Sequence, residues 1–423
     1  MLIGPRRIPA KFPGPASPVA SSPMATSAEL PTVAAPVPIF VLALGGFASG
    51  SGARLLDPLL PQIADSLGVT VAAASAVIAA FLLPYGLGQL VLGPLGDRRG
   101  KLRVVAAALT LYGLCVMACA AASDLATLVL LRAASGLFAG AAIPLMMAYL
   151  GDVVPYTERQ ATLGRFLTGM VMAQMLTGPV AGMIGERAGW RSAFLTLGVL
   201  SIAIGLTLAA RLGQRLWHPP EVADAPVPGL TAYLSLLSRP AGRWLLISAF
   251  FDGLCLFGGA FPFVGAFVIE RFGLSAGTAG LLVAGFGLGA FIYTRFARHL
   301  VRHLGESLLL LLGGIGLAAG LAGLACTPTW QVAALLQIFL GLMFYMFHGV
   351  LQARATEALP EARGAAVSAF ALALFVGQSV GSLAFGAVLA IIGYRVGFAA
   401  ASVTMLLAAI WSWRRLSPAP MPV

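Results

Sequence analysis

Four ionisable residues interrupt long apolar stretches of this chain: Arg54, Asp57, Arg132 and Asp252. Charged side chains are costly in apolar surroundings, so they usually face a partner, water or a functional site. A carboxyl group whose proton can leave near neutral pH can couple proton movement to another process, and burial and nearby cations decide whether it does so. We therefore take the two acids, Asp57 and Asp252, as candidates for proton coupling.

The two acids have different neighbours along the chain. Asp57 follows Arg54 by three residues, so both side chains lie on one face of a helix. A structural salt bridge is therefore the main alternative to a proton site at Asp57. Asp252 has no cation near it in the sequence, and its proton should be easier to keep. The alternatives there are a hydrogen-bonded structural acid or a pairing with a remote arginine.

The elements that must position these residues are membrane helices. Of the 423 residues, 59% are hydrophobic and only 10% are charged, against about 25% charged residues in soluble domains, and the mean hydropathy is +0.93. A spanning helix needs roughly 20 mostly apolar residues. The sequence predicts an all-α polytopic membrane protein with twelve transmembrane helices. The predicted spans are 36–60, 71–95, 103–123, 125–149, 162–185, 191–211, 243–269, 276–297, 306–326, 329–352, 364–391 and 395–413.

The net charge of +11 follows from where the basic residues stand and does not indicate a nucleic-acid partner. If the N-terminus is cytoplasmic, most of the 26 Lys and Arg residues fall in the termini and in the even-numbered loops. The positive-inside rule describes this asymmetry. It predicts a multi-pass protein of the inner (plasma) membrane with both termini in the cytoplasm. The loops on the other side carry only Arg187, Arg191, Arg271 and Arg395.

A charged, glycine-containing segment, Gly93–Arg103, separates two apolar runs and reads Gly-Pro-Leu-Gly-Asp-Arg-Arg-Gly-Lys-Leu-Arg. We expect a glycine-rich turn at the membrane edge, where Gly93 and Gly96 let helices approach closely. Asp97 can cap a helix or pair with a nearby base. The alternative interpretation is a simple positive-inside anchor, although an anchor has no need of Asp97.

Two helix motifs follow this segment. In the fourth predicted helix, Arg132 precedes Gly136 by four residues; snorkelling of the arginine to the membrane surface is the structural alternative to a functional role. The fifth predicted helix contains Gly178-Pro179 and then Gly182. A proline removes one helical hydrogen bond, and small residues let a neighbouring helix pack against the resulting kink.

The chain contains two related halves. Shifting the sequence by 204–205 residues superposes landmarks such as Gly100 on Gly305 and Gly136 on Gly341. Such a repeat predicts two pseudo-symmetric six-helix bundles with a substrate cavity between them, near the middle of the membrane. The charges are not repeated, because Arg132 aligns with Gln337. The predicted divisions are a disordered cytoplasmic tail 1–35, bundles 36–211 and 243–414, a cytoplasmic linker 212–242 and a cytoplasmic tail 415–423.

These motifs resemble those of the major facilitator superfamily, in particular its twelve-helix drug/sugar:proton antiporter branch. The resemblance covers the chain from about residue 36 and is strongest over 85–195. It implies that Arg132 assists proton transfer and that Gly178, Pro179 and Gly182 form an antiporter-type helix kink. It also implies a conformational latch made of Gly93, Gly96, Asp97, Arg98, Arg99, Gly100 and Lys101.

Polar residues within other predicted helices are candidates for lining the cavity. His348 can titrate at physiological pH, although a single histidine in a helix is more often a hydrogen-bonded structural residue. Which helix faces turn inward is poorly determined by a single sequence. The candidate cavity residues are Tyr85, Gln89, Gln174, Tyr345, His348 and Gln378.

No catalytic constellation, metal motif or phosphate-binding loop is recognisable, so we expect no enzyme activity, catalytic residue, metal or cofactor. The favoured function is proton-coupled efflux (antiport) of a small organic molecule or drug by alternating access. The alternatives are a proton symporter, importer or uniporter of a small metabolite on the same fold, and a non-transporting membrane sensor or scaffold. The expected partners are a small-molecule substrate, protons and the lipid bilayer, and the expected state is a monomer.

Overall fold

A computed structural model describes residues 37–213 and 230–416, and all regular elements within them are helices. The predicted tail 1–35, residues 214–229 of the predicted linker and residues 417–423 of the predicted C-terminal tail lie outside the described residues. The elements of the first half are α1 (Ile39–Arg54), α2 (Leu60–Ser66), α3 (Val71–Ala74), α4 (Ala76–Arg99), α5 (Lys101–Cys119), α6 (Leu125–Val153), α7 (Tyr156–Ala188) and α8 (Trp190–Leu212). Those of the second half are α9 (Leu230–Ser238), α10 (Pro240–Asp252), the π-helix η2 (Gly253–Ala260), α11 (Phe261–Phe272), α12 (Ala276–Cys326), α13 (Trp330–Glu357), the 3₁₀ turn η3 (Pro360–Ala362), α14 (Arg363–Ile391) and α15 (Tyr394–Leu416).

The prediction of twelve membrane-spanning helices is confirmed. Ten helical segments in the described part of the chain are long and apolar enough to cross a membrane. One of them, α12, contains two spans, because Gly305 interrupts it with a φ of 69°. The remaining span begins with α1, which has 16 residues and is followed by a turn that leads into α2. The first span is therefore broken after Arg54, where the sequence predicted a continuous helix over 36–60.

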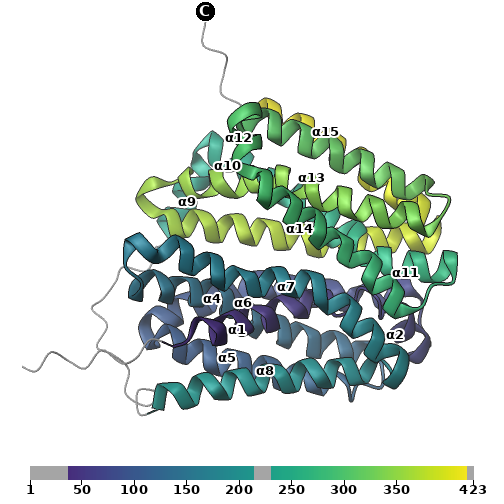
Figure 1. The fold of residues 1–423 in the computed structure, drawn as a ribbon, viewed down its shortest axis with the longest axis horizontal. Helices are drawn as coiled ribbons and strands as arrows, with labels where there is room; N and C mark the ends of the chain where they lie inside the picture. The colour runs from purple at the N-terminus through teal and green to yellow at the C-terminus, as the bar shows by residue number, and fades with distance from the viewer. Residues whose placement is uncertain (1–36, 214–229, 417–423) are drawn as a thin grey trace, which may run out of the picture. The chain divides into compact units, whose positions relative to one another are not determined.

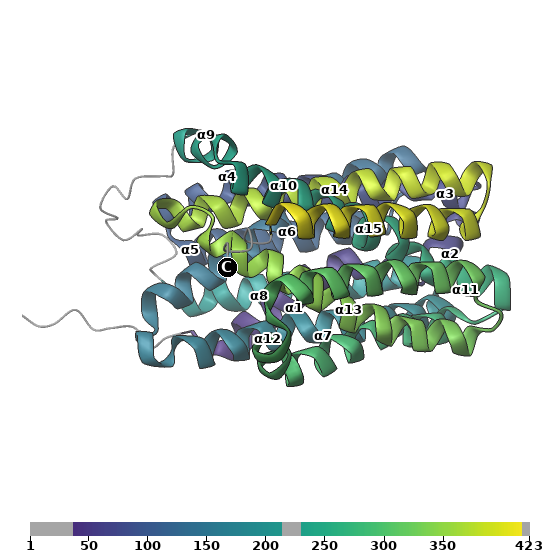
Figure 2. The ribbon, with the colours of Figure 1, turned by 90° about the horizontal axis from the view of Figure 1, so that it is seen from above.

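The helices form two bundles, which Figure 1 shows as a purple-to-teal group (α1–α8) and a green-to-yellow group (α10–α15). The long helices of both groups run along one common direction in both views (Figures 1 and 2). We call the end at which α4 is followed by α5 the basic end, and the other the opposite end. The short helix α9, within the predicted linker, lies at the basic end, where Leu236 packs on Leu359 and Ala366.

The internal repeat is visible in the backbone. Glycines with positive φ, which other residues adopt only at a cost, occur in both halves at corresponding turns. A second correspondence lies inside the bundles. A Cβ atom at Gly136 would overlap the carbonyl oxygen of Phe81, and one at Gly341 would overlap that of Phe286. The corresponding turn glycines are Gly68 and Gly273, Gly100 and Gly305, and Gly189 and Gly393.

The charged Gly93–Arg103 segment is more helical than the sequence predicted. The α4 helix continues to Arg99, and only Gly100, with a φ of 94°, breaks the chain before α5. Gly96 packs against the side chain of Leu145, as a close approach requires. Gly93 does not, because an added Cβ there would meet no atom within 4 Å. The expected glycine-rich turn is therefore a single-residue break, and the expected close packing at Gly93 was wrong.

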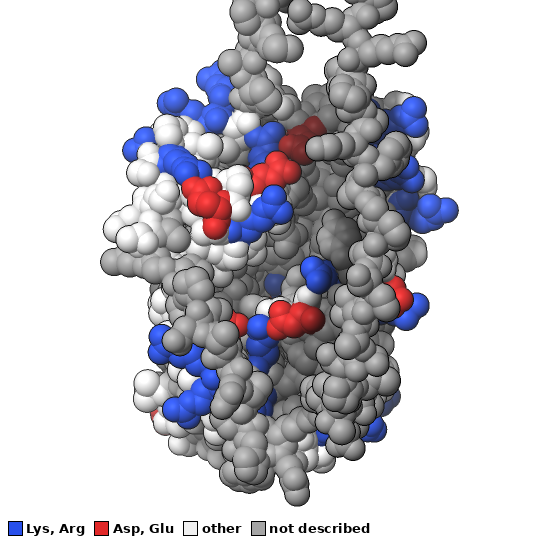
Figure 3. All heavy atoms as spheres, turned by 90° about the vertical axis from the view of Figure 1, so that its left-hand side faces the viewer, with Lys and Arg blue, Asp and Glu red and all other residues white. Residues whose placement is uncertain are grey.

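The two bundles are joined toward the opposite end. The hydroxyl of Ser379 on α14 donates to the Ala79 carbonyl on α4 at 3.1 Å, and that of Ser382 donates to the Ser75 carbonyl at 3.1 Å. A second line of contact runs between α7 and α12, where the Gly277 N–H donates to Glu186 Oε1 at 2.5 Å. At the basic end, Lys, Arg, Asp and Glu side chains gather over both bundles (Figure 3).

Candidate functional site

The second bundle holds a buried acid–histidine pair. Asp252, the last residue of α10, is 0% exposed, and its Oδ2 lies 2.6 Å from Nδ1 of His348 on α13. The other carboxyl oxygen, Oδ1, is buried and has no hydrogen-bond partner. The His348 side chain keeps 13% of its surface exposed, so it connects the enclosed acid to the space outside the core. The sequence offered no cation near Asp252; the partner comes from a helix 96 residues further along the chain.

Packing holds this pair in place. The ring of His348 stacks on Phe344 at 4.8 Å between centroids, with 15° between the ring planes. The π-helix η2 begins directly after Asp252 and lies close to α14, since a Cβ at Gly253 or Gly258 would overlap α14 backbone atoms. π-Helical turns are rare and occur frequently at functional sites. A glycine-lined π-helix therefore fixes the depth at which the Asp252 carboxyl faces His348.

The Arg54–Asp57 pair lies at the boundary between the bundles. Arg54 Nη1 and Asp57 Oδ2 are 3.5 Å apart, and both residues are almost completely buried. The guanidinium of Arg54 also lies 4.5 Å from the ring centroids of Phe257 and Phe261, which belong to the second bundle. Arginine over an aromatic face is attracted by the ring quadrupole. Arg54 thus bridges the bundles, while Arg54 Nε and Asp57 Oδ1 remain without hydrogen bonds.

Arg132 on α6 points into the first bundle and not toward the membrane surface. Its side chain is 1% exposed, its Nη2 donates to the Gly52 carbonyl at 2.9 Å, and its guanidinium lies 4.1 Å from the Phe81 ring centroid. Gly52 is in the last turn of α1, where helix carbonyls carry partial negative charge. The arginine therefore stabilises the end of α1 just before the Arg54–Asp57 turn. The snorkelling alternative does not describe this geometry.

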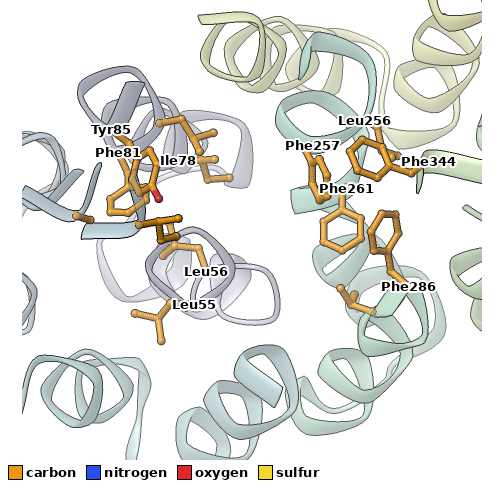
Figure 4. Packing of buried hydrophobic residues seen from close by; sticks show 14 of the residues in the cluster. Leu55, Leu56, Ile78, Phe81, Tyr85, Leu256, Phe257, Phe261, Phe286 and Phe344 are labelled. Atoms are coloured by element: carbon orange, nitrogen blue, oxygen red, sulfur yellow. The ribbon is translucent and has the colours of Figure 1, made fainter. Parts of the chain in front are cut away.

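Two apolar, largely aromatic groups face each other where the bundles meet. Figure 4 shows Leu55, Leu56, Ile78, Phe81 and Tyr85 on one side and Leu256, Phe257, Phe261, Phe286 and Phe344 on the other. Tyr85 reaches across, because its ring lies 4.6 Å from that of Phe375 on α14. Its hydroxyl is 3.2 Å from Ser49 Oγ, and Ser49 donates to the Ala139 carbonyl. These contacts hold Tyr85 in a fixed position within the group of side chains from the first bundle.

The other predicted cavity residues have less defined surroundings. Gln174 on α7 is half-buried, and its Oε1 has no hydrogen-bond partner. Gln89 on α4 is half-buried, and Gln378 on α14 is buried beside η2. Tyr345 packs edge-on against Phe344, next to His348. The six candidates lie on α4, α7, α13 and α14, which are helices of both bundles.

Comparison with known proteins identifies the family. The family model described as Major Facilitator Superfamily matches residues 42–305 and 247–423, which cover most of the chain. The chain belongs to the Major Facilitator Superfamily. It is therefore a membrane transporter that carries small molecules, not an enzyme.

Individual relatives agree with this assignment. The MFS-type transporter YwfA of Bacillus subtilis (strain 168) is 27% identical over 372 residues, which cover 86% of this chain and 89% of the relative. A chloramphenicol resistance protein of Pseudomonas aeruginosa is 26% identical over 287 residues, which cover 67% of each chain. Among solved structures, the nucleoside transporter NupG has a TM-score of 0.73 with 13% identity, covering 90% of this chain and 99% of NupG. That structural likeness shows the shared fold.

The Gly93–Arg103 segment, which contains the predicted latch, takes part in an ion network within the first bundle. Lys101 Nζ lies 3.3 Å from Asp97 Oδ1 and 2.6 Å from Asp152 Oδ2 on α6. Arg98 and Arg99 are exposed. Asp152 therefore pairs with the lysine of this segment. Lys101 joins the start of α5 to the ends of α4 and α6.

The α7 motif lies at the contact between the bundles. Gly178 and Gly182 pack on the backbone of α12 at Gly280 and Ala276. A Cβ at Gly182 would overlap the Ala276 carbonyl oxygen, whereas one at Gly178 would make ordinary van der Waals contact with Gly280. Pro179 lies inside the continuous helix α7. The predicted role in allowing close helix packing thus has a partner, the first span of α12.

Some residues of the site escaped the sequence analysis. Phe257 and Phe261, which hold Arg54, and Phe344, which stacks on His348, were read as ordinary apolar residues or not considered. Their signal was the four-residue spacing of Phe257 from Phe261 and of Phe344 from His348, which places each pair on one helix face. In a chain with 24 phenylalanines, that spacing alone does not distinguish a site from packing.

Proposed function

We propose that this facilitator exchanges protons for a small organic molecule, exporting it by alternating access, and that Asp252 and His348 hold the transported proton. The observation that carries the proposal is the 2.6 Å contact between a fully buried carboxyl group and a mostly buried imidazole. A buried charge is costly unless it is paired, so the state of one partner depends on the state of the other.

The pair can store a proton in two ways. With the imidazole charged, the carboxylate accepts a charge-assisted hydrogen bond from Nδ1–H. With the proton lost, the neutral ring still donates through Nδ1–H, but the buried carboxylate keeps an uncompensated charge. The two protonation states therefore differ in their cost of burial. Any movement of α10 against α13 changes that cost, and such a difference between states is what coupling requires.

The contacts between the bundles fit a state that is closed at the opposite end. The serine hydrogen bonds between α14 and α4 and the Arg54 clamp on Phe257 and Phe261 all join the bundles on that side. Alternating access requires these contacts to separate when the basic end closes. The positive-inside pattern supports an inner-membrane protein whose basic end and termini face the cytoplasm.

The proposed type of substrate follows from the two apolar groups of side chains that face each other between the bundles. Aromatic rings from both bundles suit a molecule with a flat apolar part, held by few polar groups. The similarity to a chloramphenicol resistance protein supports a drug-like or related organic substrate. We expect the partly buried polar side chains of Gln174 and Tyr345 to orient it.

The test uses inside-out membrane vesicles with an acidic lumen and a pH-sensitive dye. A panel of lipophilic cations, neutral drugs including chloramphenicol, sugars and organic acids is added to the wild type, Asp252→Asn and His348→Gln. We expect a substrate to release protons from the lumen in the wild type. Both variants keep a hydrogen-bonding side chain but cannot hold the proton, so we expect substrate counterflow without proton release.

A matched control is Asp65→Asn, which makes the same chemical change at an exposed acid of α2. It should leave proton release unchanged. Substrate-driven proton entry into the lumen would favour symport instead of antiport. Full proton release by Asp252→Asn would remove the pair from the coupling mechanism.

A further inference from the structure

The end of the first span of α12 carries a line of basic side chains. Arg295, Arg298, His299, Arg302 and His303 are all exposed. Their positions i, i+3, i+4, i+7 and i+8 place them on one face of the helix. We call this surface the α12 basic stripe. It lies just before Gly305, at the basic end of the second bundle.

The stripe has no counter-charge within the described residues. None of its five side chains makes a hydrogen bond or an ion pair with another part of the chain that the structure describes; the two histidine rings lie against each other with centroids 4.2 Å apart. The next acid, Glu306, is 3.4 Å from Arg354. Three arginines gathered without acids create a local positive potential that favours an anionic partner.

The same helix face is apolar and exposed further along the span. Leu281 is 62% exposed and Leu288 is 42% exposed, and Arg295 and Arg302 continue this series at seven-residue intervals. Seven residues make about two helical turns, so these four side chains share a face. An exposed apolar face on a membrane span faces the acyl chains. The basic side chains that continue this face must therefore lie in the layer of lipid headgroups.

The length of the helix supports this position. A helix crosses the hydrocarbon core in about 20 residues, and Arg295 is the twentieth residue of α12, which begins at Ala276. The stripe therefore begins where the span leaves the core and continues through the depth of the lipid headgroups. Arginine at this depth suits phosphate recognition, because its planar guanidinium donates two parallel hydrogen bonds.

We propose that the α12 basic stripe binds the headgroups of anionic phospholipids in the leaflet at the basic end. The phosphate groups accept hydrogen bonds from the guanidinium groups of Arg295, Arg298 and Arg302, while the acyl chains lie along Leu281 and Leu288. Juxtamembrane basic clusters are attracted to anionic leaflets in this way. The site is separate from the Asp252–His348 pair and does not depend on the transported substrate.

The first bundle offers an internal comparison. The positions equivalent to the stripe arginines at an offset of 205 are Leu90, Gly93 and Asp97. None of these three positions carries a base in the first bundle, where the exposed Arg98 and Arg99 lie at other positions of the helix. We therefore expect lipid binding at the second bundle only. The equivalent region of the first bundle forms ion pairs around Lys101 instead.

The experiment measures lipid binding to the purified full-length protein by native mass spectrometry, with phosphatidylglycerol and phosphatidylcholine as probes. We expect the triple variant Arg295→Gln, Arg298→Gln, Arg302→Gln to lose phosphatidylglycerol affinity by about tenfold or more, since each engaged basic residue contributes several-fold near an anionic surface. Phosphatidylcholine binding should not change. The triple Arg→Lys variant keeps the charge and should retain most of the affinity.

A matched control is Arg187→Gln, Arg271→Gln, Arg395→Gln, which removes the same charge from exposed positions at the opposite end. It should keep wild-type phosphatidylglycerol affinity, and thermal melting of each variant checks that it is folded. Unchanged affinity in the folded stripe variant would overturn the proposal. Displacement of the lipid by an equal concentration of glycerol 3-phosphate would also overturn it, because the stripe would then be a site for free phosphate.

Discussion

The two bundles have similar backbones, but their buried polar side chains differ in their hydrogen bonds. Arg132 in the first bundle and Gln337 in the second occupy equivalent positions and are both almost completely buried. Arg132 donates to the Gly52 carbonyl and lies over Phe81. Both side-chain polar atoms of Gln337 lack a hydrogen-bond partner in the described residues. The buried polar side chain of the first bundle thus contacts a neighbouring helix, whereas its equivalent in the second bundle makes no side-chain hydrogen bond in the described residues.

The ion networks at the basic end differ in the same way. Lys101 pairs with Asp97 and Asp152, whereas the equivalent residue, Glu306, pairs with Arg354. The sign of the central charge is reversed, yet each network joins the same pair of spans within its bundle. Close helix packing constrains the backbone of both halves, while many charge arrangements can stabilise a loop in water. This difference explains why glycines repeat and charges do not.

The largest expected difference between the halves is at Arg132 and Gln337. Arg132→Met leaves the Gly52 carbonyl without its donor and removes the cation from Phe81, so transport should fall by more than about tenfold. Gln337→Met removes a buried amide without partners and should raise the free energy of unfolding by about 1 kcal/mol. Vesicle transport and thermal melting measure the two effects. Equal losses of transport in both variants would contradict the comparison.

The packing glycines should respond alike in both halves. Gly136→Ala and Gly341→Ala each place a Cβ against a carbonyl oxygen of the neighbouring helix, Phe81 or Phe286. Each substitution should lower the free energy of unfolding by about 1–3 kcal/mol, the usual cost of overpacking. Gly93→Ala, in open space, is the control and should have little effect on melting. A loss confined to one bundle would mean that the packing is not equivalent.

The aromatic contacts of the two buried arginines should have different effects, because Arg54 contacts the other bundle and Arg132 contacts its own. Phe257→Leu weakens the clamp on Arg54 between the bundles and should shift the population toward opening at the opposite end by about fivefold, corresponding to about 1 kcal/mol. Phe81→Leu, under Arg132, removes a contact within one bundle and should leave this population unchanged. Spin-label distances across α2 and α11 report the opening. A shift of the same size in Phe81→Leu would show that the clamp has no special role.

The smallest expected difference is at two equivalent helix starts. Asp124 caps α6 by accepting from the Thr127 N–H, and this hydrogen bond holds the pKa of the Asp124 carboxyl below its usual value. The stabilisation is therefore present above the unfolded-state pKa near 4 and is lost as pH falls through the lower folded-state value. Asp124→Ala should reduce the melting temperature by at most about 2 °C at pH 7.

Acidification provides the check on this cap. The difference between Asp124→Ala and the wild type should shrink below pH 3. Thr329, the equivalent residue before α13, makes no side-chain capping bond, so Thr329→Ala should show no difference at either pH. A cap effect that persists in strong acid would disagree with the assigned charge.

Much of the fold could be predicted from local features. Apolar runs of about 20 residues mark the spans, and glycines such as Gly100 and Gly305 mark turns, because hydrophobicity and positive φ are properties of short segments. The site was less predictable. Asp252 was recognised as an intramembrane acid, but its partner His348 was recognised only separately. The break of α1 and the π-helix after Asp252 were missed, since both depend on neighbouring helices.

Local sequence features were enough to predict twelve membrane helices with a repeated backbone, because composition, period and glycine placement act within one segment. The expectation of a transporter came from the resemblance of the motifs to those of a known family. The tertiary structure alone decided that Asp252 meets His348, that Arg132 meets the end of α1 and that Arg54 crosses to Phe257 and Phe261. Helical periodicity relates residues only three or four positions apart. Contacts between distant helices depend on their rotation and depth, which are set by packing across the whole bundle.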